Sequence, residues 1–252
     1  MNKKTNKKTL NEIVCEWNKV SSKRQEIIEA GKDISLTYVT SPSIIRNLGE
    51  KKLSKILDVG CGTGYLTNKI STFCDLCYGI DASEEAIKIA EKKYASDKIK
   101  FLNTTISDLS VKHQFDACVS NMVIMTDPEW EMSLKRIFEL LKTNGHLLIM
   151  LTHPCFWPTY WKYSNENWFD YNKELYIEHD FQTSFSDSLG VTTHIHRPLS
   201  MYINTLKKIG FEIVNLEEPQ PAIDTPKDYS YEYPRFLLVK CKKTSTSNNK
   251  EQ

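Results

Sequence analysis

The sequence predicts an α/β fold, in which a mostly parallel sheet carries helices on both of its faces. Two observations support this prediction. Short runs typical of buried strands occur at residues 55–59, 76–80, 99–102, 115–120 and 146–151. Most of the segments between these runs have the periodicity of helices. Because strands joined by helical crossovers form right-handed parallel units, ligands are expected beyond the carboxyl ends of the strands.

Length and charge agree with a single enzyme-sized domain. The chain has 252 residues, 40% of them hydrophobic, which is enough for one large α/β domain with some additions. Its formal net charge of +1 gives no reason to expect nucleic acid or an anionic membrane as the main partner. The polar, lysine-rich start lacks the apolar stretch of a signal peptide, and no later run approaches the roughly 18 apolar residues of a membrane helix. We therefore expect a cytoplasmic protein.

The cysteines do not form the pattern of a disulfide framework. They number seven and are scattered, at Cys15, Cys61, Cys74, Cys77, Cys118, Cys155 and Cys241. Cys74 and Cys77 form a single Cys-x-x-Cys pair with no second pair and no spaced histidine, so packing is favoured over zinc binding. The sequence predicts reduced thiols and no metal site.

The most informative segment is the loop that follows the first predicted strand. It contains Gly60, Gly62 and Gly64 at alternate positions, preceded by Asp58. Glycines let a backbone turn sharply and approach a ligand closely, so three of them between a strand and a helix indicate a bound nucleotide-like molecule. Asp81 ends the next strand, about where a ribose-binding acid lies in such a unit. The sequence therefore predicts a cofactor loop.

The spacing of the glycines argues against two common cofactor classes. In the dinucleotide fingerprint the third glycine lies one residue later, where Tyr65 stands in this chain. No Gly-Lys-Ser/Thr sequence follows four residues after a glycine, so a nucleoside triphosphate has no evident phosphate-binding loop. Neither a nicotinamide or flavin site nor a P-loop is indicated.

The glycine loop and Asp81, with two later segments, resemble the class I S-adenosylmethionine-dependent methyltransferases. Residues 115–121 resemble the fourth strand of that family, and residues 134–145 resemble the helix and turn that lead into its fifth strand. The resemblance covers most of the chain. It implies a Rossmann-like, seven-stranded sheet, S-adenosyl-L-methionine as the cofactor, and an enzyme that methylates its substrate. The His-Pro-Cys-Phe sequence at residues 153–156 resembles a subgroup that acts on small molecules.

The same resemblance implies which residues bind the cofactor. The loop from Asp58 to Gly64 would contact its methionine part, and Asp81 would bind its ribose hydroxyls. Thr105 and Ile106 stand where many members have an acid that contacts adenine. Tyr38 is placed either to cover the methionine end or to pack between the N-terminal region and the core. The expected set is Asp58, Gly60, Cys61, Gly62, Gly64, Asp81, Ala82, Thr105, Ile106, Asn121 and Tyr38.

The chain is expected to have three parts. Residues 1–50 form an N-terminal helical leader or lid, residues 51–243 form the methyltransferase domain, and residues 244–252 form a disordered tail. An aromatic-rich segment at about residues 152–197 is too long for a simple connection and too apolar for a linker. We expect this cap segment, inserted after the fifth strand, to fold over the catalytic face. Most of its aromatic residues are expected to build its own small core.

Methyl transfer needs an aligned lone pair, exclusion of water and, for an oxygen nucleophile, loss of a proton. His153 is the favoured base because it follows the fifth strand at the ligand-bearing edge. Its alternative role is to order the turn into the cap segment. His196 and Arg197 are expected either to bind substrate or to anchor the cap segment to the core. The expected substrate-binding residues are Trp157, Tyr160, His196 and Arg197.

The sequence therefore predicts an S-adenosylmethionine-dependent methyltransferase that moves a methyl group to an oxygen or nitrogen of a small metabolite by in-line displacement. Two alternatives stay open. A methyltransferase acting on a peptide or another macromolecular amine would use the same core. A noncatalytic cofactor-binding module would keep the glycine loop and Asp81 and lack a substrate cavity.

Overall fold

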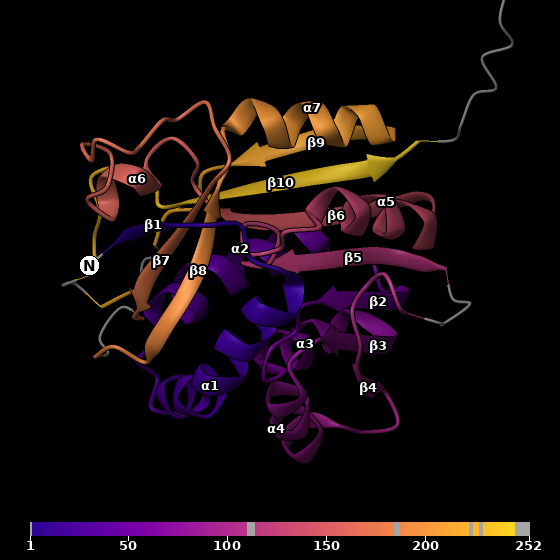
Figure 1. Ribbon diagram of the computed structural model, residues 1–252. Helices are drawn as coiled ribbons and strands as arrows, with labels where there is room; N and C mark the ends of the chain where they lie inside the picture. Colours follow the sequence, from indigo (N-terminus) through magenta and orange to yellow (C-terminus); the bar gives the residue numbers. More distant parts are fainter. Residues whose placement is uncertain (1, 110–113, 184–186, 222–223, 227–228, 245–252) are drawn as a thin grey trace, which may run out of the picture.

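A central sheet of seven strands organises the computed structural model, which describes residues 2–109, 114–183, 187–221, 224–226 and 229–244 (Figure 1). The order is β4-β3-β2-β5-β6-β10-β9, and β10 runs antiparallel to both of its neighbours. This arrangement confirms the predicted fold class. The strands are β2 (Leu53–Val59), β3 (Cys74–Asp81), β4 (Ile99–Asn103), β5 (Phe115–Asn121), β6 (Leu141–Thr152), β9 (Phe211–Glu217) and β10 (Phe236–Lys243).

The register of the parallel strands brings their carboxyl ends to one edge. Val59 of β2 lies opposite Ile80 of β3 and Ser120 of β5. The loop after β2 is tied to β3 by the backbone N–H groups of Gly60 and Cys61, which both donate to the Ile80 carbonyl, at 2.8 and 2.9 Å. The glycine loop and the residues that follow β3 and β5 therefore lie next to one another.

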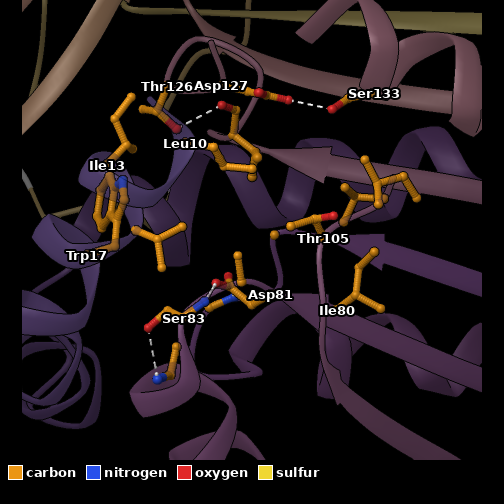
Figure 2. Close-up of a pocket in the computed structure, with 18 of the residues that line it drawn as sticks. Leu10, Ile13, Trp17, Ile80, Asp81, Ser83, Thr105, Thr126, Asp127 and Ser133 are labelled. Carbon is orange, nitrogen blue, oxygen red and sulfur yellow. Dashed lines mark hydrogen bonds between the residues drawn. The ribbon is translucent and has the colours of Figure 1, made fainter. Parts of the chain in front are cut away.

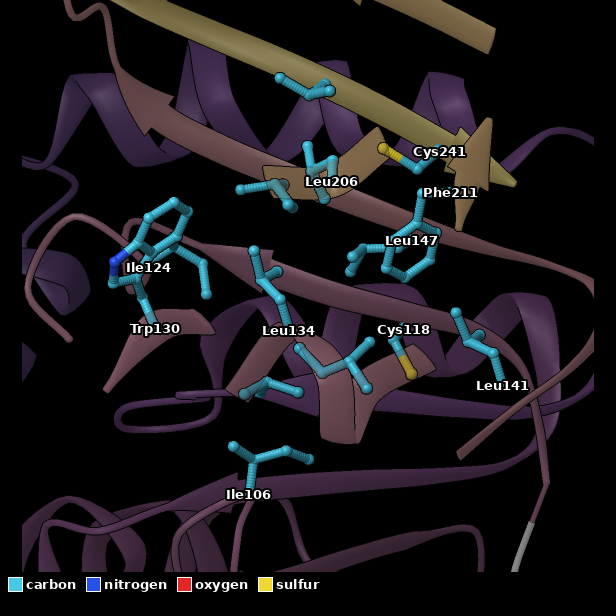
Figure 3. Packing of buried hydrophobic residues seen from close by; sticks show 14 of the residues in the cluster. Ile106, Cys118, Ile124, Trp130, Leu134, Leu141, Leu147, Leu206, Phe211 and Cys241 are labelled. Atoms are coloured by element: carbon cyan, nitrogen blue, oxygen red, sulfur yellow. The ribbon is translucent and has the colours of Figure 1, made fainter. Parts of the chain in front are cut away.

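Helices cover both faces of the sheet, which explains why its strands read as apolar runs. On one face, α5 (Trp130–Leu140) and α7 (Leu199–Ile209) pack through Leu134 and Leu206 against the sheet residue Leu147 (Figure 3). On the other face, buried side chains of α2 (Ser41–Leu48) and α3 (Tyr65–Ile70) join a second core cluster. A smaller cluster forms where α4 (Glu84–Tyr94) packs on β4.

The N-terminal region is helical, with α1 (Leu10–Glu29) as its main element and a π-helix, η1 (Ser35–Thr40), before α2. The α1 helix begins at a capping box in which Thr9 and Glu12 each bond the backbone of the other. It contacts both α4 and β8. Among the described residues, no helix is both long and apolar enough to cross a membrane.

The cap segment contains an antiparallel hairpin that the sequence analysis did not predict. After the short helix α6 (Trp157–Tyr160), strands β7 (Leu175–Phe181) and β8 (Gly190–His196) pair, and β1 (Lys3–Thr5) adds a third strand to them. Figure 1 shows this second sheet alongside the carboxyl end of β5. Tyr176 of β7 packs on α1, whereas Ile177 joins the second core cluster on the other side. Because β7 is buried on both faces, it lacks the two-residue alternation that identifies a half-buried strand.

The predicted tail at residues 244–252 lies outside the described residues, apart from Thr244. The Thr244 hydroxyl donates a hydrogen bond to the Gly210 carbonyl at 3.1 Å. The described chain therefore ends against the turn between α7 and β9.

Candidate active site

The three glycines of the loop have different roles. All have positive φ angles, of 69°, 54° and 85° for Gly60, Gly62 and Gly64. A Cβ on Gly60 would collide with the Val123 side chain, and a Cβ on Gly64 would lie 2.9 Å from the Phe101 ring. No described atom lies within 4 Å of the position that a Cβ on Gly62 would occupy. The first and third glycines thus permit packing within the protein, whereas Gly62 leaves open space in front of the backbone.

Asp58 lies at the end of β2, buried beneath the loop. Its carboxylate accepts a hydrogen bond of 2.6 Å from the Thr67 hydroxyl of α3. Burial raises the pKa of Asp58 to about 7, and the nearby charge of Asp81 acts in the same direction. Near neutral pH this carboxyl group is therefore close to half protonated, and an adjacent positive charge would favour its ionised form.

Asp81 joins the glycine loop to the start of α4. One carboxylate oxygen accepts a hydrogen bond from the Gly62 N–H and the other accepts one from the Ser83 N–H, both at 2.8 Å (Figure 2). Burial raises the pKa of Asp81, and the two N–H donors oppose that rise. The N-cap of α4 is Ser83, which accepts a hydrogen bond from the Ala86 N–H. Asp81 is therefore held by backbone groups of two segments, the glycine loop and the start of α4.

Three cavities surround these groups. The edge cavity lies at the ends of β3 and β4, where Ala82, Thr105 and Ile106 line it beside Asp81 (Figure 2). Side chains of α1 line its other side, among them Ile13 and Trp17. The glycine cavity is smaller and is lined by Asp58, Gly60, Cys61, Gly62, Thr63, Tyr65, Leu66, Arg24, Ile28, Leu36 and Asn121.

The cap cavity lies between the central sheet and the cap segment. Its walls come from η1, the end of β6, α6, β7, β8 and β10. They include Trp157 and Trp161 from around α6 and two histidines, His179 and His194, from the hairpin. Burial lowers the pKa of His179 to about 4 and that of His194 well below its ordinary value. Both imidazoles are therefore neutral at pH 7.

All three cavities meet at Arg24 and Asn121, which line each of them. Arg24 Nε and Asn121 Oδ1 are buried without a hydrogen-bond partner in the described part of the chain. The guanidinium has Asp33 nearby, with 3.9 Å between Arg24 Nε and Asp33 Oδ2. Met122, which lines the edge and cap cavities, has a φ angle of 62°, a strained conformation for a residue with a side chain. Unpaired polar atoms and backbone strain thus coincide at this junction.

The structure brings together most of the residues predicted for a cofactor, and one of those predicted for a substrate. Trp157 lines the cap cavity. The predicted cofactor residues that line the edge or glycine cavity are Asp58, Gly60, Cys61, Gly62, Asp81, Ala82, Thr105, Ile106 and Asn121. Gly64 and Tyr38 are not among the described residues that line the three cavities. Tyr38 is half-buried and packs against the core cluster beneath α2.

His153 lies outside the three cavities as the described residues define them. Its Nε2 lies 2.9 Å from Glu218 Oε1, and its Nδ1 accepts a hydrogen bond from the Cys155 N–H. Its ring contacts Phe156. Burial lowers the pKa of His153, while Glu218 opposes that shift. These contacts are those of a residue that orders the turn after β6, the alternative role considered for it.

Arg197 joins the cap segment to the core. It is 1% exposed, and its guanidinium donates to the Glu174 carboxylate at 2.7 Å and to the carbonyls of Ile124 and Asp127 at 2.9 and 2.8 Å. Both carbonyls belong to the connection between β5 and α5. The Ile195 N–H donates to the Met125 carbonyl of the same connection at 2.8 Å. Of the two roles considered for Arg197, this geometry is that of an anchor.

Two further residues predicted to bind substrate also make contacts elsewhere. His196 Nε2 lies 3.0 Å from the Tyr171 carbonyl oxygen, within the cap segment. Tyr160 is 43% exposed, and the Arg235 guanidinium lies 4.0 Å from the centre of its ring. Neither is among the described residues lining the cap cavity.

Sequence reasoning missed Trp17, Arg24, Trp161 and His179, all of which line the cap cavity. A signal for the first two is present. One side of α1 carries Ile13, Trp17 and Arg24 at helical spacing. This spacing is visible in the sequence of the predicted leader. His179 carries no such signal, because only the pairing of β7 with β8 turns it toward the cavity.

Comparison with known proteins places this site in context. A family model described as a methyltransferase domain matches residues 57–149. The malonyl-[acyl-carrier protein] O-methyltransferase of Priestia megaterium is 33% identical over 95 residues, which are 37% of this chain and 35% of that protein. An uncharacterized protein of Haemophilus influenzae is 25% identical over 226 residues, 81% of this chain and 87% of its own. The matched segment spans between a third and a half of the first curated relatives.

Solved structures share the fold at low sequence identity. An S-adenosylmethionine-dependent methyltransferase of Clostridium acetobutylicum is 18% identical, with a TM-score of 0.62 over 91% of this chain and 99% of that chain. The 1,6-didemethyltoxoflavin-N1-methyltransferase of Burkholderia thailandensis, solved with bound 1,6-didemethyltoxoflavin and S-adenosylhomocysteine, is 14% identical. Its TM-score is 0.59, over 96% of this chain and 93% of that chain.

Proposed function

We propose that this chain, which belongs to the class I S-adenosylmethionine-dependent methyltransferases, transfers the methyl group of its cofactor to a small molecule bound in the cap cavity. One observation carries the proposal. The edge and glycine cavities meet the cap cavity at Arg24 and Asn121, so a cofactor in the first two would face an acceptor in the third. Proximity and orientation of this kind supply much of the rate of a two-substrate reaction.

The residues of the first two cavities fit S-adenosylmethionine. The open space at Gly62 accommodates a ligand, and the unpartnered Arg24 Nε needs a polar partner. In the proposed assignment Asp81 binds the ribose hydroxyls, while Thr105 and Ile106 contact adenine. The glycine loop and Asp58 adjoin the methionine part, and Arg24 pairs with its carboxylate.

When bound, the cofactor supplies a methyl carbon on a positively charged sulfur, and the carbon–sulfur electron pair returns to sulfur as the lone pair of the acceptor forms its bond. The protein has to hold that lone pair in line and exclude water. In our proposal α1 and the cap segment do both. The leader, residues 1–50, acts as a lid, and the cap at about residues 152–197 encloses the acceptor above the domain of residues 51–243.

A proton must leave if the acceptor is an O–H or N–H group. The base role predicted for His153 stays a prediction. The imidazoles that line the cap cavity are those of His179 and His194. Their neutral state at pH 7 leaves each with a nitrogen lone pair for a hydrogen bond from the acceptor.

A small acceptor is favoured over a macromolecule because the cap segment is anchored to the core at Arg197, over the face where a peptide would have to enter. The match to the malonyl-[acyl-carrier protein] O-methyltransferase covers 37% of this chain and 35% of that protein, which is too little to support a carrier-bound acceptor. A noncatalytic role is disfavoured by the cap cavity itself, since a module that only holds a cofactor needs no second cavity.

Calorimetric titration tests the first requirement of the proposal, which is that the protein binds the cofactor. S-adenosylhomocysteine and S-adenosylmethionine should bind the protein, and NAD should not. Asp81→Ala should weaken binding about 30-fold, because hydrogen bonds to a charged group contribute about 2 kcal/mol. Asp75→Ala is the matched control: Asp75 is an exposed aspartate at the opposite end of β3. Well-folded protein that binds neither methionine-derived ligand would overturn the proposal.

Transfer itself is measured with a methyl-labelled cofactor and a set of small-molecule acceptors. Label should appear in a small-molecule product with the wild-type protein and decrease steeply with Asp81→Ala when the cofactor concentration is below saturation. Label found only in added peptides or acyl-carrier protein would favour the macromolecular alternative, whereas cofactor binding without any transfer would favour the noncatalytic one.

A further inference from the structure

The cap cavity is lined by a continuous series of aromatic rings. Successive rings contact one another from β10 on one side to α1 on the other, passing through α6 and β7. The ring centres are 6.1 Å apart between Phe236 and Trp157, 4.6 Å between Trp157 and Trp161, 3.6 Å between Trp161 and His179, 6.4 Å between His179 and Phe181, and 5.2 Å between Phe181 and Trp17. We call this series the ring belt. Such a surface favours a ligand that is itself flat and aromatic, because ring faces and edges stack well.

The charge of the cavity is balanced. Among its described lining residues Arg24 and Asp33 are the ones with charged side chains, and they face each other. The two histidines are held neutral by burial. An anionic ligand would find its one cation opposed by Asp33 and, under the proposed function, engaged by the cofactor carboxylate. A cationic ligand would find no free carboxylate and would be repelled by the positive sulfur of the cofactor.

Several buried polar atoms of the lining lack a partner. They are Trp157 Nε1, His179 Nδ1, Thr40 Oγ1, Asn121 Oδ1 and Arg24 Nε, and no described atom bonds them. Leaving such groups unpaired in a buried site is unfavourable, so a partner for them is expected in the loaded site. The indole N–H of Trp157 only donates, which requires a hydrogen-bond acceptor on the ligand. The amide oxygen of Asn121 only accepts, which requires a donor.

From the ring belt, the balanced charge and these polar atoms, we infer that the methyl acceptor is an uncharged, planar heteroaromatic molecule with a hydrogen-bond acceptor and a donor on its edge. Its ring lies against the belt, its acceptor atom takes the Trp157 N–H, and its donor reaches Asn121 or His179. Its nucleophilic atom then lies on the Asn121 side, where the three cavities meet. This inference rests on the proposed function, since it names the substrate class of the same site.

Three flat bicyclic probes of different charge test it. They are 4-quinolone, which is uncharged and carries a ring N–H and a carbonyl, quinoline-4-carboxylate, which is an anion, and N-methylquinolinium, which is a cation. Each is titrated calorimetrically into wild-type protein saturated with S-adenosylhomocysteine. We expect 4-quinolone to bind at least about tenfold more tightly than either charged probe. Equal or tighter binding of a charged probe, or no binding of 4-quinolone, would overturn the inference.

A pair of tryptophan variants tests the position of the ligand. Trp157→Phe keeps a ring in the belt and removes the N–H, so it should weaken 4-quinolone binding about three- to tenfold, the range for one neutral hydrogen bond. Trp168→Phe is the matched control, because Trp168 packs against Tyr163 within the cap segment and is not among the described lining residues. Equal effects of the two changes would contradict the assigned contact.

The two proposals fail in different ways. Binding of S-adenosylhomocysteine is measured first, and if the protein does not bind it, the proposed function is wrong. If the protein binds S-adenosylhomocysteine but binds a charged probe as tightly as 4-quinolone or more tightly, only the assignment of the acceptor is wrong.

Discussion

The two sides of the candidate site are built by different means. The cofactor side, formed by the glycine loop, Asp81 and the residues after β4, is shaped by backbone: glycine φ angles, strand ends and N–H donors. The cap side is shaped by side chains from η1, α6, β7, β8 and β10, which are far apart in the chain. A change on the cofactor side should therefore act locally, whereas a change on the cap side depends on anchors outside the cavity.

The largest expected effect concerns the buried carboxyl group of Asp58. Its pKa in the folded protein is about 7, against 3.8 for an ordinary aspartate. The folded state binds this proton more tightly than the unfolded state, so protonation of Asp58 stabilises the folded protein. This contribution to the free energy of unfolding is complete below about pH 4 and is lost as the pH rises through about 7. The difference between these two pKa values corresponds to about 4 kcal/mol. Relative to wild type, Asp58→Asn should become more stable by up to that amount between pH 4 and pH 8.

Urea unfolding at several pH values measures this difference. The control is Asp116→Asn, because Lys142 and two backbone N–H groups lower the pKa of Asp116. That variant should instead lose stability relative to wild type as the pH rises from strongly acidic values into the range where an ordinary aspartate ionises. A pH-independent difference between Asp58→Asn and wild type would show that this carboxyl group is not buried as described.

The second effect tests the anchor of the cap side. Arg197→Met should destabilise the protein by about 3 kcal/mol, because it removes the partner of Glu174 Oε2 and leaves two buried carbonyls unpaired. Binding of 4-quinolone should weaken while binding of S-adenosylhomocysteine is retained in the folded fraction. Arg46→Met is the control: Arg46 pairs with Glu217 at the surface, where its side chain is 62% exposed, and should cost less than about 1 kcal/mol. Equal loss of both ligands would mean that the two sides are not independent.

A smaller effect separates two glycines within the cofactor side. Gly64→Ala should lower the free energy of unfolding by about 2 kcal/mol, because its Cβ adds a clash with Phe101 and Ala90 to the strain of a positive φ. Gly62→Ala should cost about 1 kcal/mol of stability and abolish S-adenosylhomocysteine binding, because its Cβ enters open space that the cofactor needs. Thermal unfolding with and without ligand distinguishes them. The reverse pattern would contradict the roles assigned to these glycines.

The smallest effect is expected for His153. A general base contributes 10²- to 10⁴-fold to a rate, whereas His153 is held by Glu218 and Cys155 away from the cap cavity. We expect His153→Gln to lower kcat by less than about threefold and His179→Gln to raise the KM for the acceptor. The pH profile of each variant is the check. A hundredfold loss of kcat in His153→Gln would establish it as the base.

The central sheet and the cofactor loop could be predicted because their signals are local. Five strand runs, the glycine spacing and Asp81 each lie within a few residues, and the parallel topology then brings the strand ends together. The hairpin of β7 and β8 could not be predicted in the same way. Residues 175–177 are buried on both faces, between α1 and the second core cluster, so their sequence lacks the alternation of a half-buried strand.

The sheet, the loop that turns at Gly60 to Gly64 and the position of Asp81 could be predicted from the residues alone, because they follow from backbone geometry and strand order. Which histidine faces the cap cavity depends instead on how distant segments pack. His153 and His179 are both near strand ends, yet the turn at Pro154 directs one to Glu218 and the pairing of β7 with β8 directs the other into the ring belt. The direction of a side chain in such a cap depends on contacts between distant segments, which no short stretch of sequence encodes.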